Sequence, residues 1–313
     1  MVKFVIAQTP SGLDLLLNPF QLYTLPLDDW ITAAINFLVE NFRPLFQAMR
    51  LPIDWLLKGI EGLLVSSPPL ILLLLISLVT WQIAGRKIAL YCLFALALIG
   101  FLGAWEPAMV SLALVVTAVI FCLILGLPLG IACARSDHFE QITRPLLDIM
   151  QTLPTFVYLV PVVMLFGIGE VPGVIATIIY ATPPLIRLTN LGIRQVSPDV
   201  VEAAIAFGST PWQVLWEAQL PLALPTILAG INQTVLFTLG MSVITSMIAV
   251  PGLGLMVLQG VGRLDIGLAA VGGLGIVLLA ILLDRITQAM GEAHPAPAGQ
   301  QRGTIGFVRS YWF

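Results

Sequence analysis

Residue types that perform catalysis are few in this 313-residue sequence and lack the spacing that catalysis needs. Three cysteines (Cys92, Cys122 and Cys133) lie in or beside apolar runs without metal-ligand spacing, and His138 and His294 form no His-x-x-x-His or Glu-x-x-His pair. No lysine stands in a Gly-x-x-x-x-Gly-Lys-Ser/Thr loop, which would cradle a nucleotide. We therefore expect no metal site, no Ser-His-Asp triad and no ATPase activity in this chain.

The chemistry that the sequence does favour is docking, in residues 189–221. Ser197-Pro198-Asp199 combines a hydroxyl N-cap, a proline at the first helical position and an acid in the first turn. This pattern predicts a helix from Pro198 to Phe207 that ends at Gly208, a residue able to adopt the left-handed conformation. Thr210-Pro211-Trp212-Gln213 fits a capping box and predicts a second helix toward Leu220-Pro221.

The first of these helices is unusually apolar for a loop in water. Only Asp199 and Glu202 are charged, and the small Ala203 and Ala204 would let a partner approach closely. Exposed apolar patches usually mark interaction sites. The alternative is that the helix folds against the ends of neighbouring membrane spans.

Composition places these residues in a membrane protein. The chain is 58% hydrophobic and 10% charged, with a mean hydropathy of +1.00, whereas soluble domains carry about 25% charged residues. A net charge of −3 suggests no nucleic-acid partner. The sequence therefore predicts an all-α protein whose apolar surface faces the lipid bilayer.

About seven stretches approach the length of a membrane-spanning helix. They are residues 69–84, 88–104, 108–134, 146–168, 171–188, 222–250 and 267–283. One set of alternating connections carries most of the arginines, among them Arg135, Arg144, Arg187 and Arg194, whereas the opposite set carries only Arg263. Because cytoplasmic loops are enriched in Lys and Arg, we expect the N-terminus outside, and residues 189–221 and the tail 291–313 inside.

Residues 1–65 read as an N-terminal extension of a different kind. Apolar residues recur at helical spacing between residues 28 and 65 with polar residues opposite, and Pro44 and Pro52 break the run. We expect separate amphipathic helices along the outer membrane surface, with Trp30 and Trp55 at the headgroups. The alternative is that this region packs on the protein itself.

The spans offer candidates for a translocation path but few ionisable groups. The candidates are polar, aromatic or sulfur-containing residues and a proline, namely Met150, Pro154, Phe156, Tyr158, Asn232, Gln233, Ser242 and Ser246. Packing and helix–helix hydrogen bonds explain such residues equally well. Asp148 is expected to pair with Arg144, four residues earlier. Scarce mid-membrane charge disfavours an ion-coupled secondary transporter, which is the alternative function.

Four glycines between residues 251 and 265 predict an irregular apolar segment on the external side. Such a segment would either fold back into the bilayer as a gate or contact a partner protein outside.

At residues 202–221 the sequence resembles a known family. Glu202-Ala203-Ala204, Gly208 and Leu220-Pro221 match the spacing of the EAA motif of ABC importer permeases, and Ala218 departs from its usual branched aliphatic residue. Further segments resemble the permease subunit of glycine betaine, proline betaine and choline importers, so that the resemblance covers about residues 66–290. These segments are residues 126–130, 144–152, 158–169, 230–233, 247–250 and 262–265.

This resemblance implies a type I ABC importer permease fold in a bacterial cytoplasmic (inner) membrane. It implies a second copy of the chain, two cytoplasmic ATPase subunits that bind ATP and Mg, an external substrate-binding protein, and no cofactor on this chain. In the coupling loop Glu202 would anchor the helix, Ala203 and Ala204 would allow close approach, and Gly208 would set the turn, with Pro211, Leu220 and Pro221 completing the motif.

Overall fold

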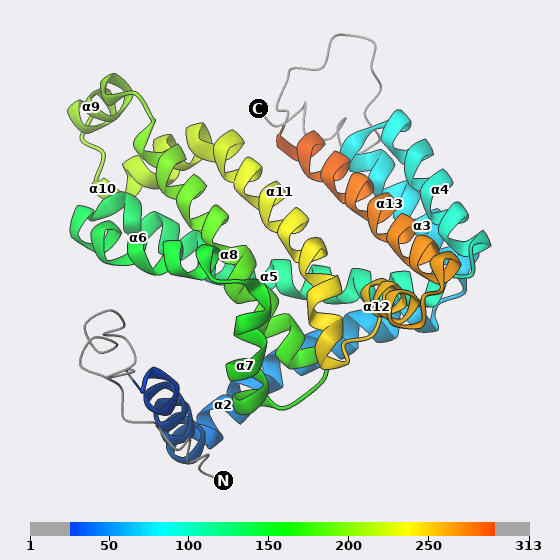
Figure 1. Cartoon of the computed structure of the whole chain (residues 1–313). Helices are drawn as coiled ribbons and strands as arrows, with labels where there is room; N and C mark the ends of the chain where they lie inside the picture. The colour runs from blue at the N-terminus through cyan, green and yellow to red at the C-terminus, as the bar shows by residue number, and fades with distance from the viewer. Residues whose placement is uncertain (1–25, 292–313) are drawn as a thin grey trace, which may run out of the picture. The chain divides into compact units, whose positions relative to one another are not determined.

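The computed structural model describes residues 26–291, and this range is helical almost throughout. The helices in chain order are α2 (Leu27–Ser66), α3 (Pro69–Ala84), α4 (Arg86–Phe101), α5 (Trp105–Arg135), α6 (Asp137–Thr152), η2 (Thr155–Tyr158), α7 (Leu159–Phe166), α8 (Glu170–Arg194), α9 (Pro198–Ala206), α10 (Pro211–Gln213), η3 (Val214–Gln219), α11 (Leu220–Thr245), η4 (Ser246–Ile248), α12 (Leu253–Arg263) and α13 (Ile266–Gly291) (Figure 1). The predicted all-α fold is confirmed. The start of the predicted extension and the tail 292–313 lie outside the described residues.

Four helices within the described range are long and apolar enough to cross a membrane. They are α5, α8, the continuous helix Pro211–Ile248 and Ile266–Met290 within α13. Two bent pairs raise the number to six, namely Leu27–Ser66 with Pro69–Ala84 at 114° and Asp137–Thr152 with Thr155–Phe166 at 105°. The predicted number of seven is higher because it includes residues 88–104, where α4 has only 16 residues and belongs to neither bent pair. The chain is a multi-pass membrane protein, and the predicted orientation of its termini stays a prediction.

The predicted span over residues 146–168 is not one straight helix, and whether the bent pair crosses the membrane stays a prediction. Its helices α6 and α7 meet at a sharp bend beside Leu153 and Pro154. Leu153 is extended, with φ −64° and ψ 137°, because the ring of a following proline disfavours the α conformation. The bend therefore follows from Pro154. The high hydropathy of the segment predicts a span and gives no sign of the bend.

The chain divides at Pro44 into two compact units, which are described separately. In the first unit the described residues form the beginning of α2, where Asn41 Nδ2 donates to the carbonyl of Phe37 at 2.8 Å. The second unit begins at Leu45 and holds the helical bundle. The predicted break of the extension at Pro44 and Pro52 is wrong, since α2 continues through both prolines.

Residues 45–66 of α2 pack on the bundle. Ile53, Leu57 and Leu64 are buried in the main hydrophobic core, and the rings of Phe46 and Phe166 lie edge to face at 5.3 Å. This is the alternative that the sequence left open for the region. Its predicted position on the outer membrane surface stays a prediction.

Helix α8 lies at the centre of the bundle, between α5 and α11 (Figure 1). Glycines permit the close approach: a Cβ atom on Gly130 of α5 would lie 2.6 Å from Cβ of Thr189, and one on Gly230 of α11 would lie 3.1 Å from Cβ of Leu188. Small residues let helix backbones approach closely in a membrane. Such packing matters there because apolar side chains gain little free energy by exchanging contacts with lipid for contacts with protein. The course of α8 is therefore fixed by its neighbours on both sides.

The predicted irregular segment at residues 251–265 is instead mostly the helix α12, which packs against α13. Its glycines serve tight packing, since a Cβ on Gly254 would lie 2.1 Å from the carbonyl oxygen of Ser242, and one on Gly260 would lie 2.5 Å from the backbone nitrogen of Ala269. Gly252 has φ 115°, and the next amide, that of Leu253, donates to Ser111 Oγ at 2.8 Å. Whether α12 enters the bilayer stays a prediction.

We predict that Gly254→Ala destabilises the detergent-solubilised protein by about 2 kcal/mol or more, because the new methyl group meets the backbone of α11. The measurement is the midpoint of thermal unfolding. Gly262→Ala is the matched control, since it lies in the same helix with no atom within 4 Å of its Cβ position. Equal midpoints for the two variants would contradict this account of the packing.

Candidate functional site

The segment that the sequence singled out forms a short helix at one end of the bundle (Figure 1). Helix α9 follows α8 after three residues and precedes α10, in agreement with the prediction of a helix from Pro198 that ends at Gly208. None of its residues is buried. Helix α9 packs against η3 and presents most of its surface to the surroundings.

Hydrogen bonds at its C-terminal end hold α9 as a rigid unit. Gly208 has φ 88°, its amide donates to the carbonyl of Ile205 at 2.9 Å, and the amide of Ser209 donates to the carbonyl of Ala204 at 3.1 Å. These two bonds form a Schellman motif. With no heavy atom within 4 Å of a Cβ on Gly208, its backbone conformation alone requires glycine there.

At the other end, the capping prediction for Ser197 is only partly right. Ser197 occupies the N-cap position, and its carbonyl accepts from the amide of Val200 at 3.1 Å, but its side chain makes no capping hydrogen bond. The predicted capping box at Thr210 is confirmed: the amide of Thr210 donates to Gln213 Oε1 at 2.8 Å and the amide of Gln213 donates to Thr210 Oγ1 at 3.4 Å.

The predicted second loop helix does not end at Leu220-Pro221. It runs without interruption into the next span, as one helix from Pro211 to Ile248. The segment Val214–Gln219 is a π-helix, in which the amide of Leu220 donates to the carbonyl of Leu215. Pro221 lacks an amide hydrogen for the usual i−4 partner, and a π-helical turn is one way to accommodate such a gap.

Exposed apolar side chains gather on and beside α9. Phe207 is 93% exposed and Ile205 is 57% exposed, and Trp212 and Trp216 on the following helix are about as exposed as Ile205. Glu202 and Ala203 are exposed and Ala204 is half-buried. The arrangement suits a partner that receives an apolar helix. Packing on the ends of the spans, the alternative raised from the sequence, is mainly the contact with η3.

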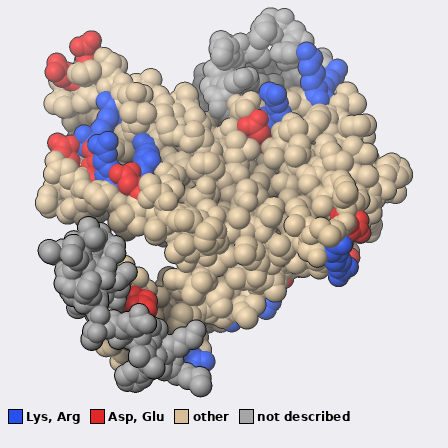
Figure 2. Space-filling view, in the orientation of Figure 1, with Lys and Arg blue, Asp and Glu red and all other residues tan. Residues whose placement is uncertain are grey.

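Charged residues lie at the base of α9, where α5, α6 and α8 meet (Figure 2). Arg194 at the end of α8 pairs with Asp137 at 2.7 Å and with Glu140 at 3.0 Å, both in the first turn of α6. Arg187 pairs with Asp148 at 2.6 Å, so the predicted pairing of Asp148 with Arg144 is wrong. Arg194, Glu140, Arg187 and Asp148 border an open cleft of about 370 Å³.

The guanidinium of Arg135 at the end of α5 lies 4.8 Å from the centre of the Trp212 ring. In the sequence analysis Arg135 and Arg194 served only to orient the membrane spans. The position of Arg194 beside the start of the loop is a sequence signal for its role, whereas Arg135 lies far from the loop in the sequence, and nothing there shows that it meets Trp212.

The eight predicted path residues lie in different surroundings. Met150, Pro154, Phe156 and Tyr158 lie at the bend between α6 and α7, where the Tyr158 hydroxyl donates to the carbonyl of Met150. Pro154 and Phe156 are exposed. Helix η2, which carries Phe156 and Tyr158, contacts α11.

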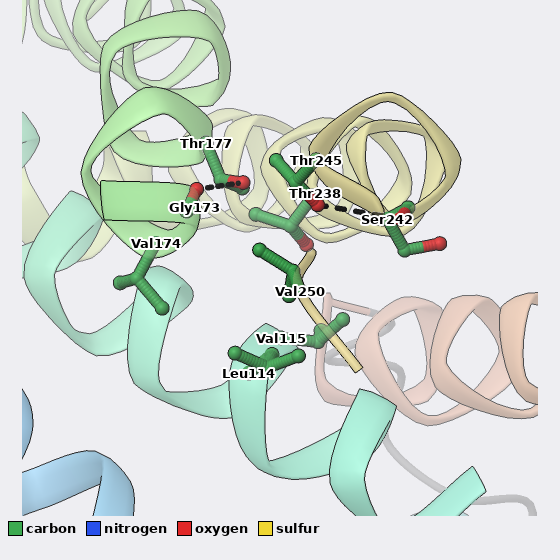
Figure 3. Close-up of a pocket in the computed structure, with 9 residues that line it drawn as sticks. All are labelled: Leu114, Val115, Gly173, Val174, Thr177, Thr238, Ser242, Thr245 and Val250. Carbon is green, nitrogen blue, oxygen red and sulfur yellow. Dashed lines mark hydrogen bonds between the residues drawn. The ribbon is translucent and has the colours of Figure 1, made fainter. Parts of the chain in front are cut away.

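The path residues on α11 and η4 also lie in different surroundings. Asn232 Nδ2 donates to Asp284 Oδ1 at 2.9 Å, so this residue joins α11 to α13. Gln233 is exposed, and the hydroxyl of Ser246 is buried and donates to the carbonyl of Val243. Ser242 lines a cavity of about 20 Å³ between α5, α8 and α11, which the other seven do not reach (Figure 3).

Threonine hydroxyls share this cavity with Ser242. Thr177 Oγ1 donates to the carbonyl of Gly173 at 2.8 Å (Figure 3). Thr238 Oγ1 donates to the carbonyl of Val235 at 2.7 Å. The hydroxyl of Ser242 is buried without a hydrogen-bond partner among the described residues. Since one water needs about 10–15 Å³, the cavity is too small for an organic solute in this conformation.

Comparison with known proteins identifies the family of this chain. Residues 126–292 match the family model "Binding-protein-dependent transport system inner membrane component". The chain is 57% identical over 293 residues to the glycine betaine/proline betaine transport system permease protein ProW of Escherichia coli (strain K12), covering 94% of this chain and 83% of that protein.

A second relative and a solved structure agree with this assignment. The glycine betaine/carnitine transport permease protein GbuB of Listeria monocytogenes serotype 1/2a (strain 10403S) is 44% identical, over 86% of this chain and 96% of its own length. A structure of the MetNI methionine ABC transporter in an inward-facing conformation matches 57% of this chain and 92% of its own chain, with a TM-score of 0.52 and 22% identity, which supports the fold. The chain, a bundle of apolar helices with the exposed helix α9 at one end, therefore belongs to the family of binding-protein-dependent transport system inner membrane components.

Proposed function

We propose that this chain is the permease subunit of an ATP-driven importer for glycine betaine and related quaternary ammonium solutes, among them proline betaine and choline. The names of its relatives support the substrate class. The observation that carries the mechanism is α9, an apolar helix with no buried residue that ends in a phenylalanine exposed to 93%. An uptake system driven by an ion gradient, the alternative function, has no support from these relatives.

In this proposal α9 lies on the cytoplasmic side of a bacterial inner membrane and seats in a groove of a separate ATPase subunit. The concentration of arginines beside α9 supports that orientation. The complete importer would hold two copies of this chain, two ATPase subunits and an external substrate-binding protein. ATP and Mg would bind to the ATPase subunits and no cofactor to this chain.

Closure of the two ATPase subunits would then displace α9. A short helix with defined ends moves as a rigid piece, and the Schellman motif at Gly208 and the capping box at Thr210 supply those ends. Glu202 would anchor the helix in the ATPase, and Ala203 and Ala204 would let its backbone approach closely. Displacement would pass directly into α11, because Pro211, Leu220 and Pro221 belong to one continuous helix.

The substrate would pass along the continuous helix Pro211–Ile248, whose polar residues Gln233, Ser242 and Ser246 remain candidates for the path together with those at the bend between α6 and α7. A quaternary ammonium group is permanently charged and its nitrogen donates no hydrogen bond, so aromatic faces such as Phe156 and Tyr158 suit it. The small cavity beside Ser242 does not admit such a solute. We therefore place the path between the two copies of the chain, with selectivity residing mainly in the binding protein.

The proposal is tested by a cysteine at position 203 carrying a short photoactivatable crosslinker. The native cysteines Cys92, Cys122 and Cys133 are buried, which favours selective labelling of the exposed position. We expect a crosslink to an ATP-hydrolysing subunit and labelling only from the cytoplasmic side. Labelling from outside, or a crosslink that never reaches an ATPase, would overturn the proposal.

We predict that Phe207→Ser weakens binding of the ATPase subunit by about tenfold or more, because a phenylalanine buried at an interface contributes about 2 kcal/mol. Affinity is measured between detergent-solubilised permease and purified ATPase. The same substitution at Phe101, which is 91% exposed at the end of α4, is the control and should leave affinity unchanged. The docking role of Phe207 is wrong if both variants bind like wild type.

We also predict that Gly208→Val lowers transport per ATP hydrolysed by about tenfold, because a β-branched residue at φ 88° is strained and the end of α9 must rearrange. Gly208→Asn should retain more of the coupling, since asparagine tolerates this region better. Uptake and phosphate release are measured on the same proteoliposomes. Identical coupling in the two variants would show that the backbone conformation at Gly208 does not matter.

A further inference from the structure

We propose that the corner between α5 and α6, residues 133–140, receives the movement of α9 through three positioning residues, Arg194 on one side of α9 and Arg135 with Trp212 on the other. This inference rests on the proposed role of α9. Movement of α9 can pass directly along the chain into α8 and α11, and the corner adds a second route. The corner provides this route because its residues contact both ends of the loop that holds α9.

The contact before α9 uses all three nitrogens of the Arg194 guanidinium. Nη1 pairs with Asp137 at 2.7 Å, Nη2 donates to the carbonyl of Cys133 at 2.8 Å and lies 3.0 Å from Glu140 Oε2, and Nε donates to Asn190 Oδ1 at 2.8 Å. Asn190 in turn donates to Glu140 Oε1 at 2.9 Å. One isolated surface ion pair contributes little, but a planar guanidinium engaged on every side has a fixed geometry. The last turn of α8 is thus held to the end of α5 and the start of α6.

The contact after α9 is between Arg135 and Trp212. The guanidinium of Arg135 lies 4.8 Å from the centre of the indole ring, within the range of a cation–π interaction. Trp212 belongs to the turn that the capping box of Thr210 and Gln213 holds in place. The start of the long helix Pro211–Ile248 is therefore attached to the end of α5.

These two contacts decide where force on α9 can go. Helix α9 has no buried residue, so a displacement leaves it through its two connections. Both connections touch the same corner, through residues that lie within Cys133–Glu140. Movement of this corner would reach α6, and beyond its bend the segment η2, which contacts α11. The corner thus joins the moving helix to the candidate path residues at Phe156 and Tyr158.

The test compares coupling in the complete importer, isolated with its ATPase and binding protein and reconstituted in liposomes. We expect Arg135→Gln and Trp212→Leu each to lower glycine betaine transported per ATP hydrolysed by about threefold to tenfold, the range of a moderate cation–π contact. Trp212→Phe, which keeps an aromatic face, should restore most of the ratio. The double variant of Arg135→Gln and Trp212→Leu should lose no more than either single one, because both remove the same contact.

The chain offers a matched control at a second arginine–tryptophan pair. Arg86 lies 5.8 Å from the centre of the Trp81 ring at the junction of α3 and α4, and Arg86→Gln should leave the ratio unchanged. Asp137→Asn tests the other connection with little risk to folding, since the Asp137 side chain is 79% exposed, and should lower the ratio by about twofold. If the Arg135→Gln variant does not assemble into the importer, the transport ratios of Trp212→Leu and Asp137→Asn test the role of the corner.

The outcomes separate this inference from the proposed function. A crosslink from position 203 to the ATPase, with an unchanged ratio in Trp212→Leu and Asp137→Asn, overturns the role of the corner and leaves the role of α9 intact. Losses that multiply in the double variant also overturn it, because Trp212 would then act independently of Arg135. Absence of the crosslink in the otherwise unchanged protein overturns the proposed function itself.

Discussion

The close approach of α8 to α5 and α11 is the constraint on which the rest of the structure depends. In a membrane, apolar side chains gain little free energy by exchanging lipid contacts for protein contacts. Helix association therefore relies on the close packing that glycines such as Gly130 and Gly230 permit. A methyl group at Gly130 would meet Thr189, five residues before the end of α8. Since α9 follows α8 after three residues, the position of this exposed helix depends on backbone contacts within the bundle.

Polar interactions in the described residues divide by location. Within the bundle, many hydroxyls, such as those of Thr117, Thr177 and Thr234, bond to carbonyls of their own helix, which satisfies them without fixing a neighbour, although a few polar groups, such as Asn232, bond across helices. At the base of α9, in contrast, Arg194 and Arg187 bond across helices. Packing thus holds the apolar bundle, and directional charge contacts hold the end that the proposed partner would move.

The sequence predicted α9, its end at Gly208 and the capping box at Thr210 well because their signals are local. Pro198, Gly208 and the pair Thr210 and Gln213 act through neighbours at most a few residues away. The sequence predicted poorly wherever a contact with a residue distant in the chain determines the structure. Asp148 pairs with Arg187 of another helix, and the glycines of α12 reflect the backbones of α11 and α13 and not a loop. The bend at Pro154 has a local signal, but the hydropathy of the segment outweighed it in the prediction. The candidate path residues were chosen by residue type and not by position in the fold, and they lie in different surroundings.

The energetics of the proposed coupling favour stiffness over affinity. Moving a two-state equilibrium from 1:99 to 99:1 takes about 5.5 kcal/mol of differential binding, and a partner that binds both states equally shifts nothing. Full burial of Phe207 contributes about 2 kcal/mol, but the groove that receives it would hold it in either state. Docking of α9 therefore cannot itself drive the change, and the free energy must come from nucleotide-driven closure of the partner. What this chain must supply is a connection that does not bend, and the Schellman motif, the capping box and the three-sided contact of Arg194 are of that kind.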